Sequence, residues 1–135
     1  MPAHPNTLIM RAAEKEIFRR FSALFKPLGF EMTKMRFWTR IHGEFEESVY
    51  LHRGGMTYGA PFSTSTSYRI HLAVRSLKEE VPGMRPETLV VSIPPKGYHF
   101  GFNAKNEATF ERCVTDLHRY CLNVADPWFK GFRDS

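Results

Sequence analysis

Arginine, histidine and aromatic side chains alternate with apolar ones in the middle of the chain, and their types suit the binding of anions or flat rings. The clearest case is the segment 67–75, whose apolar parity consists of Tyr68, Ile70, Leu72 and Val74. Its other parity carries Arg69, His71, Ala73 and Arg75. Because successive side chains of a strand point to opposite faces, this segment predicts an interior strand with one apolar and one basic face.

Two earlier segments, 30–41 and 45–53, extend the same alternation. We expect their polar parities to join that of 67–75 in one surface, the predicted basic face. Its members are Lys34, Arg36, Trp38, Arg40, Tyr50, His52, Arg69, His71 and Arg75, with His99 as a further candidate. Cations that hold phosphate and flat rings that stack on bases are what single-stranded nucleic acid requires. Arginine also grips carboxylates through two parallel bonds.

Three other interpretations of this surface remain open. A solvated sheet face needs polar residues in any case, and Trp38 with Tyr50 could form a purely structural pair across two strands. The surface could also bind a protein partner or a second copy of the chain, since a fold alone does not fix a function.

Catalytic and metal-binding patterns are weak in this sequence. His52 and His71 are the best candidates for a general base, but no nucleophile motif, phosphate loop or zinc spacing accompanies them. His118 and Cys121 supply too few ligands for a metal. We therefore predict no catalytic residues, no metal and no cofactor. Cys113 and Cys121 lie eight residues apart on a predicted helix, about 12 Å, too far for a disulfide.

The remaining elements follow from periodicity and breaker residues. Spacings of three and four predict a helix from Asn6 or Thr7 to about Leu28, with Glu14 on its solvent side, and a second helix over 107–124 that ends at Asp126-Pro127. Strands are predicted over 30–41, 45–53, 67–75, 88–93 and 98–102, with an irregularity near Glu47, which interrupts the apolar parity. The segments 1–5, 54–66 and 77–87 are predicted to be a loose tail and two loops.

These elements predict a single α+β domain over residues 1–135, a two-layer sandwich of an antiparallel sheet of about five strands between an N-terminal and a C-terminal helix. The links between strands are too short for crossover helices, so the sheet must be antiparallel. The chain has 135 residues, 42% of them hydrophobic, and a net charge of +5. No secretory signal or membrane span is visible, which predicts a cytoplasmic protein that does not enter a membrane.

The run Phe25-Lys26-Pro27-Leu28-Gly29-Phe30, followed by Arg36-Phe37-Trp38-Thr39-Arg40, resembles the opening of an uncharacterised bacterial family. In that family a helix ends in a KPLGF-like turn and continues into an aromatic strand, and the strand Ile70–Val74 fits a later element. The resemblance covers about residues 14–75. This chain departs from the pattern at Trp38, where tyrosine is usual, and at His71-Leu72-Ala73, in place of Asn-Leu-Gly. The resemblance implies a small cytoplasmic bacterial domain of unknown function and transfers no catalytic residue.

The sequence thus favours a non-enzymatic binding domain that uses its sheet face and the 54–66 loop, with a protein partner or a second copy of itself as the ligand. The alternative is single-stranded nucleic acid or a small anion bound through Arg36, Trp38, Arg40, Arg69 and His71. An enzyme that uses His52 or His71 is the remote alternative.

Overall fold

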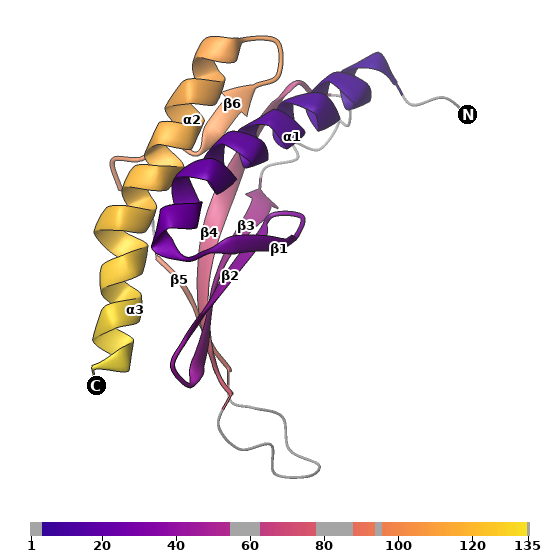
Figure 1. Ribbon diagram of the computed structural model, residues 1–135. Helices are drawn as coiled ribbons and strands as arrows, with labels where there is room; N and C mark the ends of the chain where they lie inside the picture. Colours follow the sequence, from indigo (N-terminus) through magenta and orange to yellow (C-terminus); the bar gives the residue numbers. More distant parts are fainter. Residues whose placement is uncertain (1–3, 55–62, 78–87, 94–95, 135) are drawn as a thin grey trace.

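The computed structural model describes residues 4–54, 63–77, 88–93 and 96–134. A long helix comes first, six strands follow, and the chain ends in further helical segments (Figure 1). The elements are α1 (Pro5–Phe25), the 3-10 turn η1 (Lys26–Leu28), β1 (Glu31–Lys34), β2 (Phe37–His42), β3 (Phe45–Gly54), β4 (Ser65–Ser76), β5 (Thr88–Ser92), β6 (Gly101–Asn103), α2 (Glu107–Tyr120), the π-helical turn η2 (Cys121–Ala125) and α3 (Asp126–Arg133).

The strands form one antiparallel sheet in the order β1-β2-β3-β4-β5, and β6 pairs with the start of β4. β4 is the longest strand, with 12 residues, and it pairs with β3 over the whole length of that strand. The predicted α+β arrangement of an N-terminal helix, an antiparallel sheet and a C-terminal helix is confirmed.

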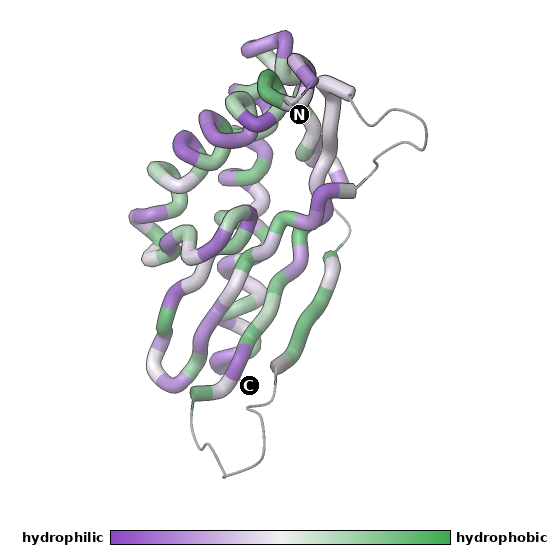
Figure 2. The backbone as a smooth tube through the Cα atoms, turned by 90° about the vertical axis from the view of Figure 1, so that its right-hand side faces the viewer, coloured by the Kyte–Doolittle hydropathy of each residue, from purple (hydrophilic) through white to green (hydrophobic). Residues whose placement is uncertain are grey.

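The helices and the sheet form separate layers (Figures 1 and 2). α1 lies across the strands, while α2, η2 and α3 follow one another as a continuous rod beside it (Figure 1). α1 buries an apolar stripe, as its periodicity predicts, that consists of Met10, Ala13, Ile17, Phe18, Phe21 and Phe25. Its burial against the sheet removes apolar surface from water, the main driving force for folding.

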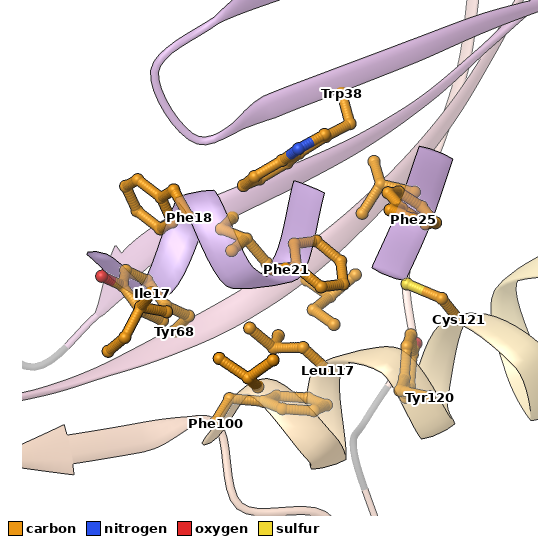
Figure 3. Close-up of a cluster of buried hydrophobic side chains, with 14 of the residues drawn as sticks. Ile17, Phe18, Phe21, Phe25, Trp38, Tyr68, Phe100, Leu117, Tyr120 and Cys121 are labelled. Carbon is orange, nitrogen blue, oxygen red and sulfur yellow. The ribbon is translucent and has the colours of Figure 1, made fainter. Parts of the chain in front are cut away.

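Trp38 is the largest fully buried side chain and joins the two layers. Figure 3 shows it pointing from β2 toward Phe18 and Phe21 of α1. Its ring meets both edge-on, with centroids 5.6 Å from Phe18 and 4.9 Å from Phe21. The indole N–H donates to Ser22 Oγ at 3.0 Å, so its one polar group is satisfied inside the core.

The predicted strand 30–41 is divided into β1 and β2 by a tight turn at Met35 and Arg36, and its prediction as one strand was wrong. Arg36 has φ = 61°, in the left-handed region that L-residues rarely adopt. This conformation lets the chain reverse, so that Lys34 lies opposite Phe37. Gly29 takes the left-handed cap after η1, with φ = 91°.

The C-terminal helix continues past Asp126-Pro127, which was predicted to end it. Pro127 lies in the first turn of α3, a position where proline is well tolerated in helices. The π-helical turn η2 joins α2 to α3 at this point.

Three further local predictions differ from the structure or fall partly outside the described residues. β3 shows no bulge at Glu47, because its pairing with β4 is continuous from Phe45 to Gly54. The first helix begins at Pro5 with His4 as its cap, earlier than the predicted Asn6 or Thr7. Of the predicted tail and loops, residues 1–3, 55–62 and 78–87 lie outside the described residues.

Candidate functional site

The predicted basic face does not form one surface, because its residues lie on both sides of the sheet. Residues that lie directly opposite each other in an antiparallel sheet share a face. Trp38 lies opposite Val49, which lies opposite Leu72, and all three are fully buried under the helices. The outward placement predicted for Trp38 and Arg40 was therefore wrong, as it was for Arg36, which reaches back to α1.

Arg40 is held in a network of charges between the sheet and α3. Its Nε donates to Glu47 at 2.6 Å and its Nη2 to Asp126 at 2.7 Å. The guanidinium also lies 4.3 Å from the ring centroid of Phe30. Glu47 accepts a second bond, 2.9 Å long, from Arg133 Nε. The donors of Arg40 are therefore used within the fold and are not available to a ligand.

Arg36 makes a two-bond ion pair with a buried carboxylate of α1. Its Nε and Nη2 each donate to Glu14 at 3.0 Å, and Tyr68 Oη donates to the same carboxylate at 2.6 Å. Arg53 Nη1 lies 3.7 Å from Glu14. Burial, together with the Glu14 charge, raises the pKa of Tyr68 well above its usual value, so the phenol stays protonated and keeps donating. The solvent-side placement predicted for Glu14 was wrong.

The open face, which points away from the helices, holds the other predicted residues except His99, together with apolar ones. Its members are Lys34, Phe37, Thr39, Ile41, Glu46, Ser48, Tyr50, His52, Arg69, His71, Ala73, Arg75, Val90 and Ser92. Ile41 is 62% exposed and Val90 57%. Arg69 is exposed, and Arg75 makes a 3.3 Å ion pair with Glu46. This face is therefore more apolar and less basic than the sequence predicted.

Four rings gather at one end of the open face. Tyr50 stacks on His71 with a centroid distance of 5.9 Å, and Phe37 and His52 flank Tyr50 at 6.1 Å each. His52 and His71 lie 5.8 Å apart, centroid to centroid. Partial burial, together with the nearby His52 and Arg69 charges, lowers the pKa of His71. His99 lies elsewhere, before β6, where its backbone N–H donates to Asp116 of α2.

A large half-open groove lies between α1 and the β1–β2 hairpin, with a volume of about 1330 Å³. Apolar side chains from α1, the start of β1 and the hairpin turn line it: Met10, Phe18, Phe30, Met32 and Met35. Met32 and Met35 are exposed, at 46% and 68%. Three methionines give the lining an adaptable surface, because the unbranched thioether side chain repacks readily.

The rim of the groove is mainly cationic. Arg11, Lys15, Arg19 and Lys26 come from the helical side, and Arg36 and Arg53 from the sheet side. The acids that line the groove are Glu14, Glu16 and Glu31. Glu14 is used by Arg36, and Glu16 by Arg19 and Arg20. The hydrogen bonds from these two arginines lower the pKa of Glu16 to about 2. Two of the three acids are thus already neutralised by cations of the chain itself.

Sequence reasoning missed this groove, although one signal pointed to it. Glu14 lies four residues after Met10 and four before Phe18, on the apolar stripe of α1. A carboxylate at such a position must meet a cation or a donor when the helix docks. That requirement indicates a polar cluster beside α1, but it does not identify Arg36 as the partner.

Among the residues that the structure describes, no group of three or more His, Cys, Asp and Glu side chains is arranged to hold a metal ion. Both cysteines are free and buried, and burial raises the pKa of Cys113 to about 12. Such a thiol is a poor nucleophile. None of the described helices has the length and apolar character needed to cross a membrane.

Comparisons with protein-family models, with curated proteins and with solved structures return no match for this chain. The resemblance carried by Phe25–Phe30 and Arg36–Arg40 therefore stays a prediction. The geometry of the groove and of the open face is the basis on which a function can be argued.

Proposed function

We propose that this chain is a non-enzymatic protein-interaction domain and that the groove between α1 and the β1–β2 hairpin is its binding site. The observation that carries the proposal is the combination of an apolar lining from Met10, Phe18, Phe30, Met32 and Met35 with a volume of about 1330 Å³. The largest apolar concavity with a few convergent polar groups is the default binding site of a domain.

The shape of the groove supports a polypeptide ligand over a small molecule. Its volume lies above the range of about 300–1000 Å³ that is usual for small-ligand pockets. The residues that line it extend along α1 and into η1, from Thr7 to Lys26, about 28 Å at the rise of an α-helix. A site that long and half-open suits an elongated segment of a partner protein.

A peptide-display selection against the folded wild-type chain tests this proposal without assuming the charge of the ligand. We expect enriched peptides that bind wild type and lose at least ten-fold in affinity for Met32→Asp, which places a charge in the lining. Ile41→Asp on the open face is the matched control and should bind as wild type does. The proposal fails if no peptide is enriched, or if the enriched peptides bind Met32→Asp unchanged.

The open face supports a second candidate function, association with a second copy of the chain. Ile41 and Val90 expose apolar surface there, and Phe37 and Tyr50 add partly exposed rings. Exposed apolar surface on a sheet face is typical of an interaction site. Light scattering at increasing concentration should show a dimer that Ile41→Asp dissociates and Met32→Asp leaves intact. A monomer at all concentrations would exclude this candidate.

The predicted alternative of single-stranded nucleic acid or a small anion has lost most of its support. Of its five residues, Trp38 is buried, Arg40 is held by Glu47 and Asp126, and Arg36 lies at the groove beside α1 and not on the open face. Arg69 and His71 alone remain on the open face, and two contacts are few for a site that must track a phosphate backbone.

A further inference from the structure

The two sides of the groove carry the same sign of charge, and this narrows the class of partner. Six cationic and three acidic side chains line it. Arg11, Lys15 and Lys26 make no ion pair with any residue that the structure describes. On the opposite side Arg53 reaches Glu14 only at 3.7 Å. The cations therefore exceed the acids on both sides of an apolar floor.

Arg36 is fixed in place before any partner arrives. Glu14 holds its guanidinium by two bonds of 3.0 Å, and Tyr68 in turn fixes Glu14. The Arg36 carbonyl accepts from the Leu51 N–H at 2.8 Å, which anchors its backbone. The side chain nevertheless remains 24% exposed at the groove. A cation ordered in advance loses less entropy when it binds a carboxylate, so it contributes more to affinity.

The backbone of Arg36 adds an independent observation. At φ = 61° it lies in the left-handed region, which is unfavourable for a residue that carries a Cβ. Strained residues of this kind cluster at functional sites, where the surrounding contacts enforce them. Here the left-handed turn at Arg36 sets the end of the β1–β2 hairpin, which forms one side of the groove.

We propose that the groove binds an acidic amphipathic helix of a partner protein, an inference that rests on the proposed function. A helix presents an apolar stripe at i, i+3, i+4 and i+7, which matches the apolar floor. Carboxylates on both flanks of that stripe face Arg11, Lys15 and Lys26 on the helical side and Arg36 and Arg53 on the sheet side. The span of about 28 Å accommodates about 18 helical residues.

Three synthetic helical peptides test the charge and the conformation together. They share one apolar stripe and carry glutamate, glutamine or lysine on its flanks, and their affinities are measured by fluorescence anisotropy. The glutamate peptide should bind at least ten-fold more tightly than the glutamine peptide, and the lysine peptide most weakly. The difference should shrink as salt is raised, since salt screens exposed charges. Circular dichroism of the complex should show added helix.

A charge reversal on the rim gives the matched variants. Lys15→Glu should weaken the glutamate peptide and strengthen the lysine peptide, while Lys130→Glu on α3, which does not line the groove, should change neither. Equal binding of the three peptides would overturn the acidic partner and leave the proposed function standing. If none of the three peptides binds, while display yields peptides that lose affinity for Met32→Asp, the helical partner alone would be overturned. Failure of both experiments would overturn the proposed function itself.

Discussion

Glu46 and Glu47 are neighbours on β3 whose carboxylates face opposite sides of the sheet. Glu47 is fully buried and pairs with Arg40 and Arg133, whereas Glu46 pairs with Arg75 on the open face. The difference in environment decides what each pair contributes. A buried carboxylate leaves its cations uncompensated when it is removed, while a surface pair is screened by water.

Glu47→Ala should lower the free energy of unfolding by about 3–5 kcal/mol, because Arg40 loses a buried partner. Glu46→Ala, the matched control one residue away, should lower it by less than about 1 kcal/mol. Urea unfolding followed by Trp fluorescence measures both. Equal losses for the two variants would contradict the burial of Glu47 under the helices.

His71 makes the stability of the fold depend on pH. Its pKa is lowered from the ordinary value of 6.5 by partial burial, His52 and Arg69, so the unfolded chain takes up a proton more readily. Its contribution is therefore present above pH 6.5 and is lost as the pH falls from 6.5 through the folded pKa. Wild type should lose more unfolding free energy between pH 8 and pH 5 than His71→Gln does, as measured by urea titration. Equal losses in the two proteins would mean that His71 does not contribute to the pH dependence of stability.

At the scale of elements, α3 is attached to the sheet through both charge and an aromatic core contact. Phe129 is fully buried and lies 5.9 Å from Phe30, centroid to centroid. Arg40 bonds Asp126 at the start of α3, and Arg133 bonds Glu47 near its end. The helical rod from Glu107 to Arg133 is therefore fixed to the sheet along α3 as well as along α2.

Phe129→Ala should cost about 3–5 kcal/mol of stability, the usual effect of an aromatic cavity in a core. Leu122→Ala in the same rod, at a side chain that is 44% exposed, should change the stability by about 0.5 kcal/mol or less. Thermal unfolding by calorimetry compares the two. A small effect at Phe129 would mean that α3 is not held against the sheet in solution.

The sequence predicted the elements better than it predicted their faces. The alternation in 67–75 identified β4 correctly, since one parity is wholly apolar there. In β2 both parities carry apolar and polar residues, so the pattern left two choices and the wrong one was taken. The hairpin register places Arg40 opposite Glu47, which indicates an ion pair between the two strands. It does not decide which face the pair occupies, because Glu46 and Arg75 form such a pair on the open face.

The candidate site could not be predicted from the sequence because its parts come from distant segments. Glu14 and Arg36 are 22 residues apart, and Glu14 and Tyr68 are 54 apart. Their contact depends on how α1 docks across the sheet and on the left-handed turn at Arg36. Neither feature has a local sequence signature of the kind that glycine gives at Gly29.

On the scale of the whole molecule, two exposed apolar surfaces lie on different sides. The groove lies on the helical side and has a cationic rim, while the open face lies on the other side of the sheet and carries Ile41, Tyr50 and Val90. The central claim is that the groove, rather than the open face, is the primary binding site. Substitutions of Met32 and Ile41 distinguish the two surfaces. Both are exposed apolar residues of the β1–β2 hairpin, but Met32 lines the groove and Ile41 lies on the open face.

The most direct measurement is the fluorescence of 1-anilinonaphthalene-8-sulfonate, an anionic apolar dye, titrated with folded wild type, Met32→Asp and Ile41→Asp. We expect enhanced emission with wild type and Ile41→Asp and its loss with Met32→Asp, with near-UV circular dichroism confirming that all three are folded. Enhancement that survives Met32→Asp and disappears in Ile41→Asp would place the primary binding site on the open face instead of in the groove.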